Sequence, residues 1–231
     1  EALFEPMGFK RGAFTPSYGL AETTLAASFA PLGQGLKKHT IDMDRYERTT
    51  EAVTASELTP AAARRTFVAC GTVLPDHEIE IRDIKNNVLT GSKVGRICLR
   101  GPSVSPGYFR NSQATEAAFT KEGWLDTGDL GYWLDDQLVV TGRSKDLILW
   151  HGRNIWPQDI EWAAQAAAPH RCGRACAFAI GGAGDEKQIM LLLECRTRDQ
   201  SLLDEIFKAV TAAIRLEVGV PVRLQLVPKS T

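Results

Sequence analysis

Three short segments of the sequence carry the residue types that nucleotide chemistry requires. In the first, Ser17 to Glu22, Gly19 allows a tight turn between an aromatic ring, Tyr18, and a carboxylate, Glu22. An aromatic ring can stack on a purine, and a carboxylate can hold Mg²⁺ against phosphates. An alternative is a tyrosine packed in a loop beside a solvated glutamate. Taken alone, the segment favours this simpler interpretation over a nucleotide site.

The other two segments place a carboxylate and a guanidinium near glycines. In Trp124 to Gly131, Asp129 can accept hydrogen bonds from both hydroxyls of a ribose, each worth about 1.5 to 3 kcal/mol. The alternative is an ordinary Asp-Gly turn. In Thr141 to Ile148, Arg143 offers a planar donor fork for ribose or phosphate oxygens, and the alternative is a surface Arg-Asp pair.

Composition excludes several classes of partner. The 231 residues include 27 Lys and Arg against 28 Asp and Glu, a net charge of −1, so neither nucleic acid nor an anionic membrane is an expected partner. No apolar run approaches the roughly 18 residues that a membrane span needs, which predicts a soluble protein. The length suits one large or two smaller domains.

The five cysteines are an odd number, and most lie in apolar, strand-like segments. This pattern predicts reduced thiols and a cytoplasmic location, not a disulfide framework. Cys172 and Cys176 lie near His170, but their spacing is not that of a CxxC metal site and no second ligand pair follows. We therefore expect ordinary core and surface residues there.

The elements that must position these groups fall on either side of a boundary between residues 144 and 145. Before it, we expect a tight loop leading into a buried apolar segment at 20–28, and an irregular polar insertion at 33–65. Period-two patterns predict strands near 78–82, 94–100 and 137–141, with a loop-rich stretch at 107–133.

After the boundary the pattern changes to alternating helices and strands. Pro157 opens a helix that ends before Pro169, and Ser201 caps a second helix that Gly219 ends. Strands are expected at 146–150, 175–180, 189–195 and 222–226. The pattern over residues 146–231 therefore predicts a small α+β domain, in which two helices pack on a mixed sheet.

Four segments, taken in order, closely resemble the adenylate-forming superfamily of acyl-CoA synthetases, luciferases and peptide-synthetase adenylation domains. They are SYGLAE, GRICLRGPSVSPGY, WLDTGDLGY and GRSKDLILWHGRNIWPQDIE. Among these families, the segments SYGLAETT and GRNIWPQDIE most resemble those of the fatty acyl-AMP ligases. The resemblance implies a mixed α+β fold: the β-rich C-terminal portion of the large adenylation domain at 1–144, then a small, truncated α+β C-terminal domain at 145–231.

The resemblance also implies roles for individual residues. Gly19 and Ala21 belong to the nucleotide-binding loop, and Ala21 replaces a threonine whose hydroxyl contacts the α-phosphate in many relatives. Thr23 and Thr24 are candidates to supply that hydroxyl. The remaining matches are Tyr18 for adenine stacking, Glu22 for Mg²⁺, Asp129 for both ribose hydroxyls, Arg143 for ribose and phosphate, and Lys145 for the hinge between half-reactions.

The 48 residues between Glu22 and Gly71 separate the subfamilies. Fatty acyl-AMP ligases carry an insertion here, thought to oppose the domain rearrangement that CoA thioesterification needs. The resemblance thus implies ATP, Mg²⁺ and a fatty acid as reactants and an acyl-adenylate product. The acceptor would be the phosphopantetheine of an acyl carrier protein or of a polyketide or peptide synthase carrier domain.

Two family features have no equivalent in this sequence: the upstream phosphate loop and the downstream catalytic lysine, a role that we do not assign to Lys229. The chain therefore resembles a C-terminal fragment that is inactive alone, because most of the transition-state stabilisation is missing. Two alternatives stay open. One is an acyl- or aryl-CoA synthetase with an unusual insertion, and the other is a non-catalytic binding or interaction module.

Overall fold

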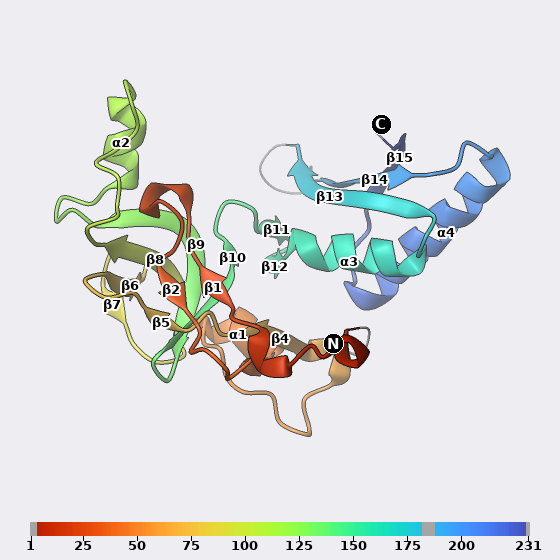
Figure 1. Ribbon diagram of the computed structural model, residues 1–231. Helices are drawn as coiled ribbons and strands as arrows, with labels where there is room; N and C mark the ends of the chain where they lie inside the picture. Colours follow the sequence, from red (N-terminus) through yellow and green to blue (C-terminus); the bar gives the residue numbers. More distant parts are fainter. Residues whose placement is uncertain (1–3, 182–187, 230–231) are drawn as a thin grey trace. The chain divides into compact units, whose positions relative to one another are not determined.

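The computed structural model describes residues 4–181 and 188–229. The chain forms two compact units, Glu1–Ser144 and Lys145–Thr231. The first unit consists mainly of strands, and the second contains a three-stranded sheet and two long helices (Figure 1). Among the described helices, none combines the length and the apolar character that crossing a bilayer requires.

A five-stranded antiparallel sheet organises the first unit, in the order β10-β9-β8-β6-β7. The alternating pattern at 78–82 forms β6, in which Ile79 and Ile81 are buried against the core. The strands are β6 (Glu78–Arg82), β7 (Val88–Leu89), β8 (Gly95–Arg100), β9 (Leu125–Leu134) and β10 (Gln137–Arg143).

The stretch 107–133, expected to be rich in loops, contains a helix and most of a ten-residue strand. The helix is α2 (Ser112–Ala118), which Asn111 caps by accepting from the amide of Ala114, and the strand is β9. The strand pairs with β8 on one side and with β10 on the other. This pairing on both sides outweighs the turn preference of its aspartates and glycines, which is why local sequence misled the prediction.

The insertion at 33–65 is also more regular than expected. It contains β3 (Lys38–Asp42), α1 (Met43–Thr49), a 3₁₀ turn η4 (Ala61–Ala63) and the start of β4 (Arg64–Val68), and β3 pairs with β4 over five residues. Ile41 and Tyr46 are buried. The expectation of an irregular excursion was therefore wrong, because a few apolar residues among many polar ones suffice to pack the segment.

A small sheet near the N-terminus has the order β1-β2-β5, formed by Ser17–Tyr18, Ser28–Phe29 and Thr72–Val73. Between β1 and β2 the chain makes a 3₁₀ turn, η3 (Ala21–Thr23). Thr23 and Ala27 are buried, whereas Leu25 is 78% exposed. The predicted buried segment at 20–28 is thus buried only in part, because the turn carries its middle residues outward.

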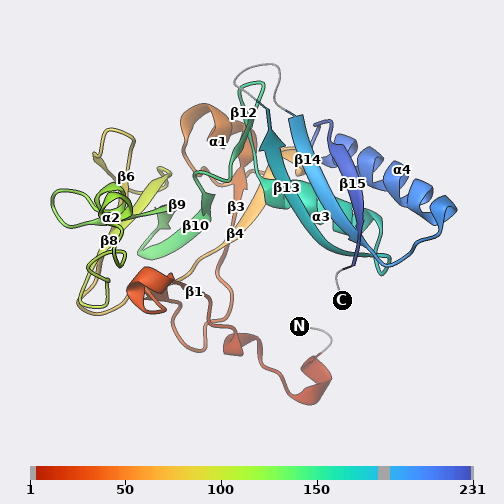
Figure 2. The ribbon, with the colours of Figure 1, turned by 90° about the horizontal axis from the view of Figure 1, so that it is seen from above.

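The second unit is the α+β domain that the sequence predicts. Its strands β13, β14 and β15 lie side by side (Figure 2); β13 and β14 are antiparallel, and β14 and β15 are parallel. Both long helices contribute to a single core against this sheet, with Ile160, Ile206 and Leu191 among its buried residues. The elements are β11 (Ile148–Trp150), β12 (Arg153–Ile155), α3 (Pro157–Ala167), β13 (Cys172–Ile180), β14 (Gln188–Cys195), α4 (Gln200–Glu217) and β15 (Arg223–Pro228).

The cap of α4 differs from the prediction by two residues. Asp199, not Ser201, is the capping residue: its Oδ1 accepts from the amides of Ser201 and Leu202 and from the Ser201 hydroxyl. These hydrogen bonds hold the pKa of the Asp199 carboxyl below its usual range. At the other end, the amide of Gly219 donates to Ile214 and its φ of 74° suits glycine.

If the insertion is part of the folded core, removing a buried side chain from it destabilises the first unit. Ile41 is fully buried, and Ile41→Ala is expected to lower the free energy of unfolding by about 2 to 5 kcal/mol. Leu58, 93% exposed in the same insertion, provides the control, and Leu58→Ala should change stability by less than about 0.5 kcal/mol. Urea unfolding of both variants measures the difference, and equal stabilities would contradict an insertion that packs as part of the core.

Candidate functional site

An irregularity in β9 presents Asp129. In its pairing with β8, Leu130 lies opposite Arg96 and Asp126 lies opposite Cys98, so β9 has two extra residues between these pairs. Gly128, within this bulge, has a φ of 74° that L side chains rarely adopt. Bulges re-aim side chains next to functional sites, and this one explains why the motif needs a glycine beside its aspartate.

The Asp129 carboxylate accepts one hydrogen bond on each oxygen. The Tyr18 hydroxyl donates to Oδ2 at 2.7 Å, and Nε of Arg143 donates to Oδ1 at 2.9 Å. Asp129 is only 7% exposed, whereas the Arg143 side chain is 61% exposed. Tyr18 and Arg143, which belong to two other motifs of the sequence, therefore converge on the buried carboxylate of Asp129.

Tyr18 is buried and fixed by its hydrogen bond to Asp129, a contact that the sequence did not predict. Its side chain is buried, which raises the pKa of the phenol, and the nearby Asp129 charge raises it further. The hydroxyl thus stays protonated and acts as a donor to the carboxylate. Stacking of this ring on adenine remains a prediction, and its role in orienting Asp129 was not anticipated.

Gly19 allows the loop after Tyr18 to pass close to a later part of the same loop. A Cβ atom at this position would lie 1.8 Å from the carbonyl oxygen of Leu25, a distance that no side chain tolerates. The Tyr18 carbonyl also accepts from the amide of Ala27. The glycine of the first motif is therefore required by close backbone approach, in keeping with the tight turn that the sequence predicts.

Glu22 lies on η3, four residues after Tyr18, and contacts a different tyrosine. The Tyr108 hydroxyl donates to Oε1 of Glu22 at 2.7 Å, and the amide of Ser105 donates to the Glu22 carbonyl at 2.7 Å. Sequence reasoning missed Tyr108, although it ends the motif GRICLRGPSVSPGY. An aromatic hydroxyl that follows a Pro-Gly loop was the available signal.

The other predicted site residues differ in how far they are exposed to solvent. Ala21 is exposed on η3, and Lys145 is exposed at the start of the second unit. Of the two threonines considered for the missing hydroxyl, Thr23 is buried and donates to the carbonyl of Leu20, so it is not available to a phosphate. Thr24 is exposed, with a φ of 67°, and is the candidate that remains.

The side chains around Glu22 fit a magnesium ion that is shared with a nucleotide. Protein sites for Mg²⁺ typically use one or two carboxylates, and phosphates and waters complete the octahedron. Tyr108 uses only one of the carboxylate oxygens of Glu22. Within residues 4–181 and 188–229, no cluster of three or more acidic, histidine or cysteine side chains would bind a metal without such phosphates.

Comparisons with known proteins agree with these motifs. The model of the AMP-binding enzyme family matches residues 5–109. A putative acyl-CoA synthetase of Caulobacter vibrioides is 45% identical over 97% of this chain and 39% of its own length. A medium-chain fatty acid to acyl-carrier-protein ligase of Moorena producens is 32% identical over 92% of this chain and 38% of its own length. The chain therefore spans about two fifths of the length of these relatives.

Solved structures show the same likeness. One from a study of fatty acyl-adenylate ligases of E. coli and L. pneumophila has a TM-score of 0.88 and 40% identity, and covers 98% of this chain and 40% of that one. A fatty acyl-adenylate ligase of L. pneumophila in complex with acyl adenylate and pyrophosphate has a TM-score of 0.60 and 29% identity over 98% of this chain and 41% of that one. With its motifs, fold and relatives in agreement, the chain belongs to the AMP-binding enzyme family, the adenylate-forming superfamily, and its relatives include fatty acyl-AMP ligases.

Proposed function

We propose that this chain is the C-terminal portion of a fatty acyl-AMP ligase, which uses ATP and Mg²⁺ to convert a fatty acid to an acyl-adenylate. In this proposal the acyl group is then transferred to the phosphopantetheine of a carrier protein. The observation that carries the proposal is the Asp129 carboxylate held between Tyr18 and Arg143. The likeness to the solved fatty acyl-adenylate ligases and to the Moorena acyl-carrier-protein ligase supports it.

The contacts of Asp129 leave hydrogen-bonding capacity for a ribose. A carboxylate has about four lone-pair sites, and Tyr18 and Arg143 occupy one on each oxygen. Two neighbouring ribose hydroxyls can donate to the remaining sites without displacing either partner. Because Tyr18 and Arg143 already orient the carboxylate, little further ordering is needed when the nucleotide binds.

Arg143 has a second task in the proposed reaction. The fatty acid carboxylate attacks the α-phosphorus of ATP in line, a new oxygen–phosphorus bond forms, and pyrophosphate leaves. The Arg143 guanidinium is largely exposed beyond its contact with Asp129, so it can reach ribose or phosphate oxygens. Its positive charge there favours the developing negative charge, and the fixed carboxylate keeps it in position.

Glu22 is the residue proposed to hold Mg²⁺, with Tyr108 as a positioning residue. When bound, Mg²⁺ would neutralise charge on the phosphates. By donating to Oε1, Tyr108 restrains the Glu22 carboxylate, and in this proposal its other oxygen would bind the metal. The sequence contains no match to the phosphate loop or to the catalytic lysine of the family, so we expect this chain to bind nucleotide without catalysing the reaction.

The nucleotide site is tested by calorimetric titration of this chain with a non-hydrolysable acyl-AMP analogue and with AMP. Asp129→Asn removes the charge and replaces one acceptor oxygen by an NH₂ group, which only donates, so the affinity should fall at least about tenfold, or 1.4 kcal/mol. Asp135→Asn is the matched control. It changes an exposed aspartate in the turn between β9 and β10, whose φ of 56° asparagine tolerates, and it should leave binding unchanged.

Equal affinities for wild type and Asp129→Asn would overturn the assignment of Asp129. If the folded chain binds neither ligand, residues outside it are required, and the ATP KM of the same variant in the complete enzyme then decides the question.

The role of Tyr108 is tested by ATP–pyrophosphate exchange in the complete enzyme at varied Mg²⁺. Tyr108→Phe should raise the Mg²⁺ concentration for half-maximal rate about two- to tenfold, because one hydrogen bond to Glu22 is lost, with little change at saturating Mg²⁺. Glu22→Gln should have a larger effect. Phe109→Ala, at the adjacent and highly exposed aromatic residue, should have none. A loss of rate in Tyr108→Phe that excess Mg²⁺ does not restore would contradict a positioning role.

The alternative activity, an acyl-CoA synthetase, is favoured by the name of the Caulobacter relative. The two are distinguished by giving the complete enzyme ATP and a fatty acid together with either CoA or a carrier protein that bears phosphopantetheine. We expect acyl-carrier thioester and no acyl-CoA, because the insertion at 33–65 resembles that of the AMP ligases. Acyl-CoA formed at a comparable rate would favour the synthetase instead.

A further inference from the structure

Two cysteines of the second unit lie opposite each other on neighbouring strands. Cys172 is the first residue of β13 and Cys195 is the last residue of β14, and they are direct partners in the register. Their sulfur atoms are 3.9 Å apart, and both are free thiols. Neither residue has a role in the proposed nucleotide site, so their proximity calls for a separate explanation.

The backbone at this position suits a covalent bond between the two sulfurs. The amide of Arg196 donates to the carbonyl of Arg171 at 3.0 Å, which makes that neighbouring pair a hydrogen-bonded one. Because bonded and non-bonded pairs alternate in antiparallel strands, Cys172 and Cys195 occupy a non-bonded pair, where Cα atoms lie about 4.5 Å apart. Disulfides require Cα separations of about 4.4 to 6.8 Å, so no strand has to move.

The side chains of Cys172 and Cys195 lie on the same face of the sheet. Cys195 is 3% exposed and belongs to the core between the sheet and the two helices, and Cys172 packs against the same core from a half-buried position. The register shifts between Cys172 and Ala175, and this shift sets the face on which Cys172 lies. Closing the gap to the disulfide length of about 2 Å then requires only side-chain rotation.

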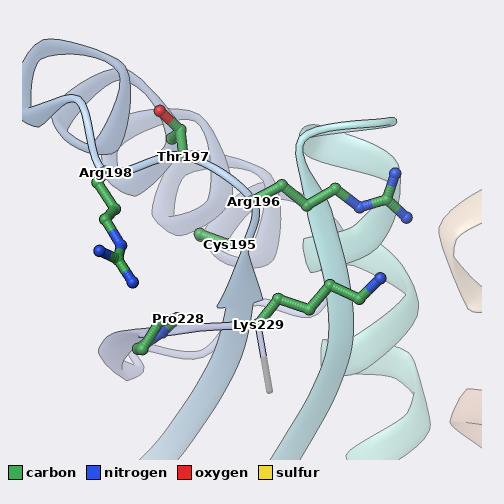
Figure 3. Close-up of a pocket in the computed structure, with 6 residues that line it drawn as sticks. All are labelled: Cys195, Arg196, Thr197, Arg198, Pro228 and Lys229. Atoms are coloured by element: carbon green, nitrogen blue, oxygen red, sulfur yellow. The ribbon is translucent and has the colours of Figure 1, made fainter. Parts of the chain in front are cut away.

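Several positively charged side chains lie beside Cys195. Beyond Cys195, Arg196, Arg198 and Lys229 line a cavity of about 370 Å³ together with Cys195 itself (Figure 3). Figure 3 shows the Arg196 and Lys229 side chains extending in the same direction from the ends of neighbouring strands. Burial and, to a smaller extent, Cys195 raise the pKa of the Cys172 thiol to about 12, and the charge of Arg196 acts in the opposite direction.

We propose that Cys172 and Cys195 form a reversible disulfide when the protein is exposed to a hydroperoxide. This modification site is independent of the proposed ligase activity. It would join the start of β13 to the end of β14, where the amide of Lys229 already ties β15 to the carbonyl of Cys195. The bond would thus fasten all three strands at one end of the sheet.

The chemistry requires one equivalent of peroxide. The thiolate of Cys172, the more exposed of the two, attacks the peroxide oxygen; the O–O bond breaks, and hydroxide, which takes up a proton, and a sulfenic acid result. The Cys195 sulfur then attacks the sulfenic sulfur, loses its proton and expels a second water. In total, two thiols and one hydrogen peroxide give one disulfide and two waters, and a dithiol such as dithiothreitol reverses the bond by exchange.

The test is oxidation of the reduced chain with stoichiometric hydrogen peroxide, followed by thiol counting and peptide mapping. The five thiols should fall to three, with one intramolecular cross-link between Cys172 and Cys195 that dithiothreitol removes. Cys176→Ser is the matched control, because Cys176 is exposed on the same strand, and this variant should form the same cross-link. Cys172→Ser, and Cys195→Ala, which keeps an apolar side chain in the core, should not form it.

Two further readouts distinguish a bond in the native fold from one trapped after local opening. The cross-link should raise the thermal unfolding midpoint by several degrees, because it constrains the unfolded chain. Its rate of formation should rise about tenfold per pH unit between pH 7 and 9, as the thiolate fraction of Cys172 rises. A midpoint below that of the reduced chain, thiol loss only at Cys176, or cross-links only between molecules would each overturn the proposal.

Discussion

The buried carboxylate of Asp129 is the constraint on which the arrangement of the candidate site depends. A charge removed from water is costly unless hydrogen bonds replace the lost hydration. Those bonds come from Tyr18, 111 residues earlier, and from Arg143, 14 residues later. Tyr18 belongs to the small sheet and Arg143 to the large one, so satisfying this one charge brings two sheets together. The contacts that satisfy this buried charge thus also hold together the part of the fold that forms the proposed nucleotide site.

The insertion is coupled to the same strand. Tyr132, three residues after Asp129 on β9, is fully buried, and its hydroxyl lies 2.8 Å from Nδ1 of His39 in the insertion. The other ring nitrogen of His39 lies 2.9 Å from the Thr54 hydroxyl, and burial lowers the pKa of the ring, which favours its neutral form. Hydrogen bonding between these partners therefore anchors the insertion to β9, the strand that carries Asp129.

Local pattern predicted those elements whose burial follows a simple period. Ile79 and Ile81 alternate cleanly in β6, and the apolar runs of the second unit gave its sheet and helices. In β9 the prediction failed because Gly128 and Asp129 resemble a turn, and only pairing with strands on both sides makes this segment extended. The sequence motifs predicted Tyr18, Asp129 and Arg143 as site residues one by one. Their convergence depends on a bulge and on long-range pairing, which no local window contains, and the same is true of the contact between Glu22 and Tyr108.

The packing of the insertion also determines how its role can be studied. Tyr18, Asp129 and Arg143 are proposed to contact the nucleotide, and nucleotide binding is common to AMP ligases and CoA synthetases, so these residues do not separate the two activities. The resemblance places the difference in the insertion, yet deleting 33–65 would remove His39, the hydrogen-bonding partner of the buried Tyr132 hydroxyl. A change in product after such a deletion would mix loss of the insertion with damage to β9. Substitutions at exposed positions of the insertion, such as Leu58, preserve that contact and therefore address product choice more directly.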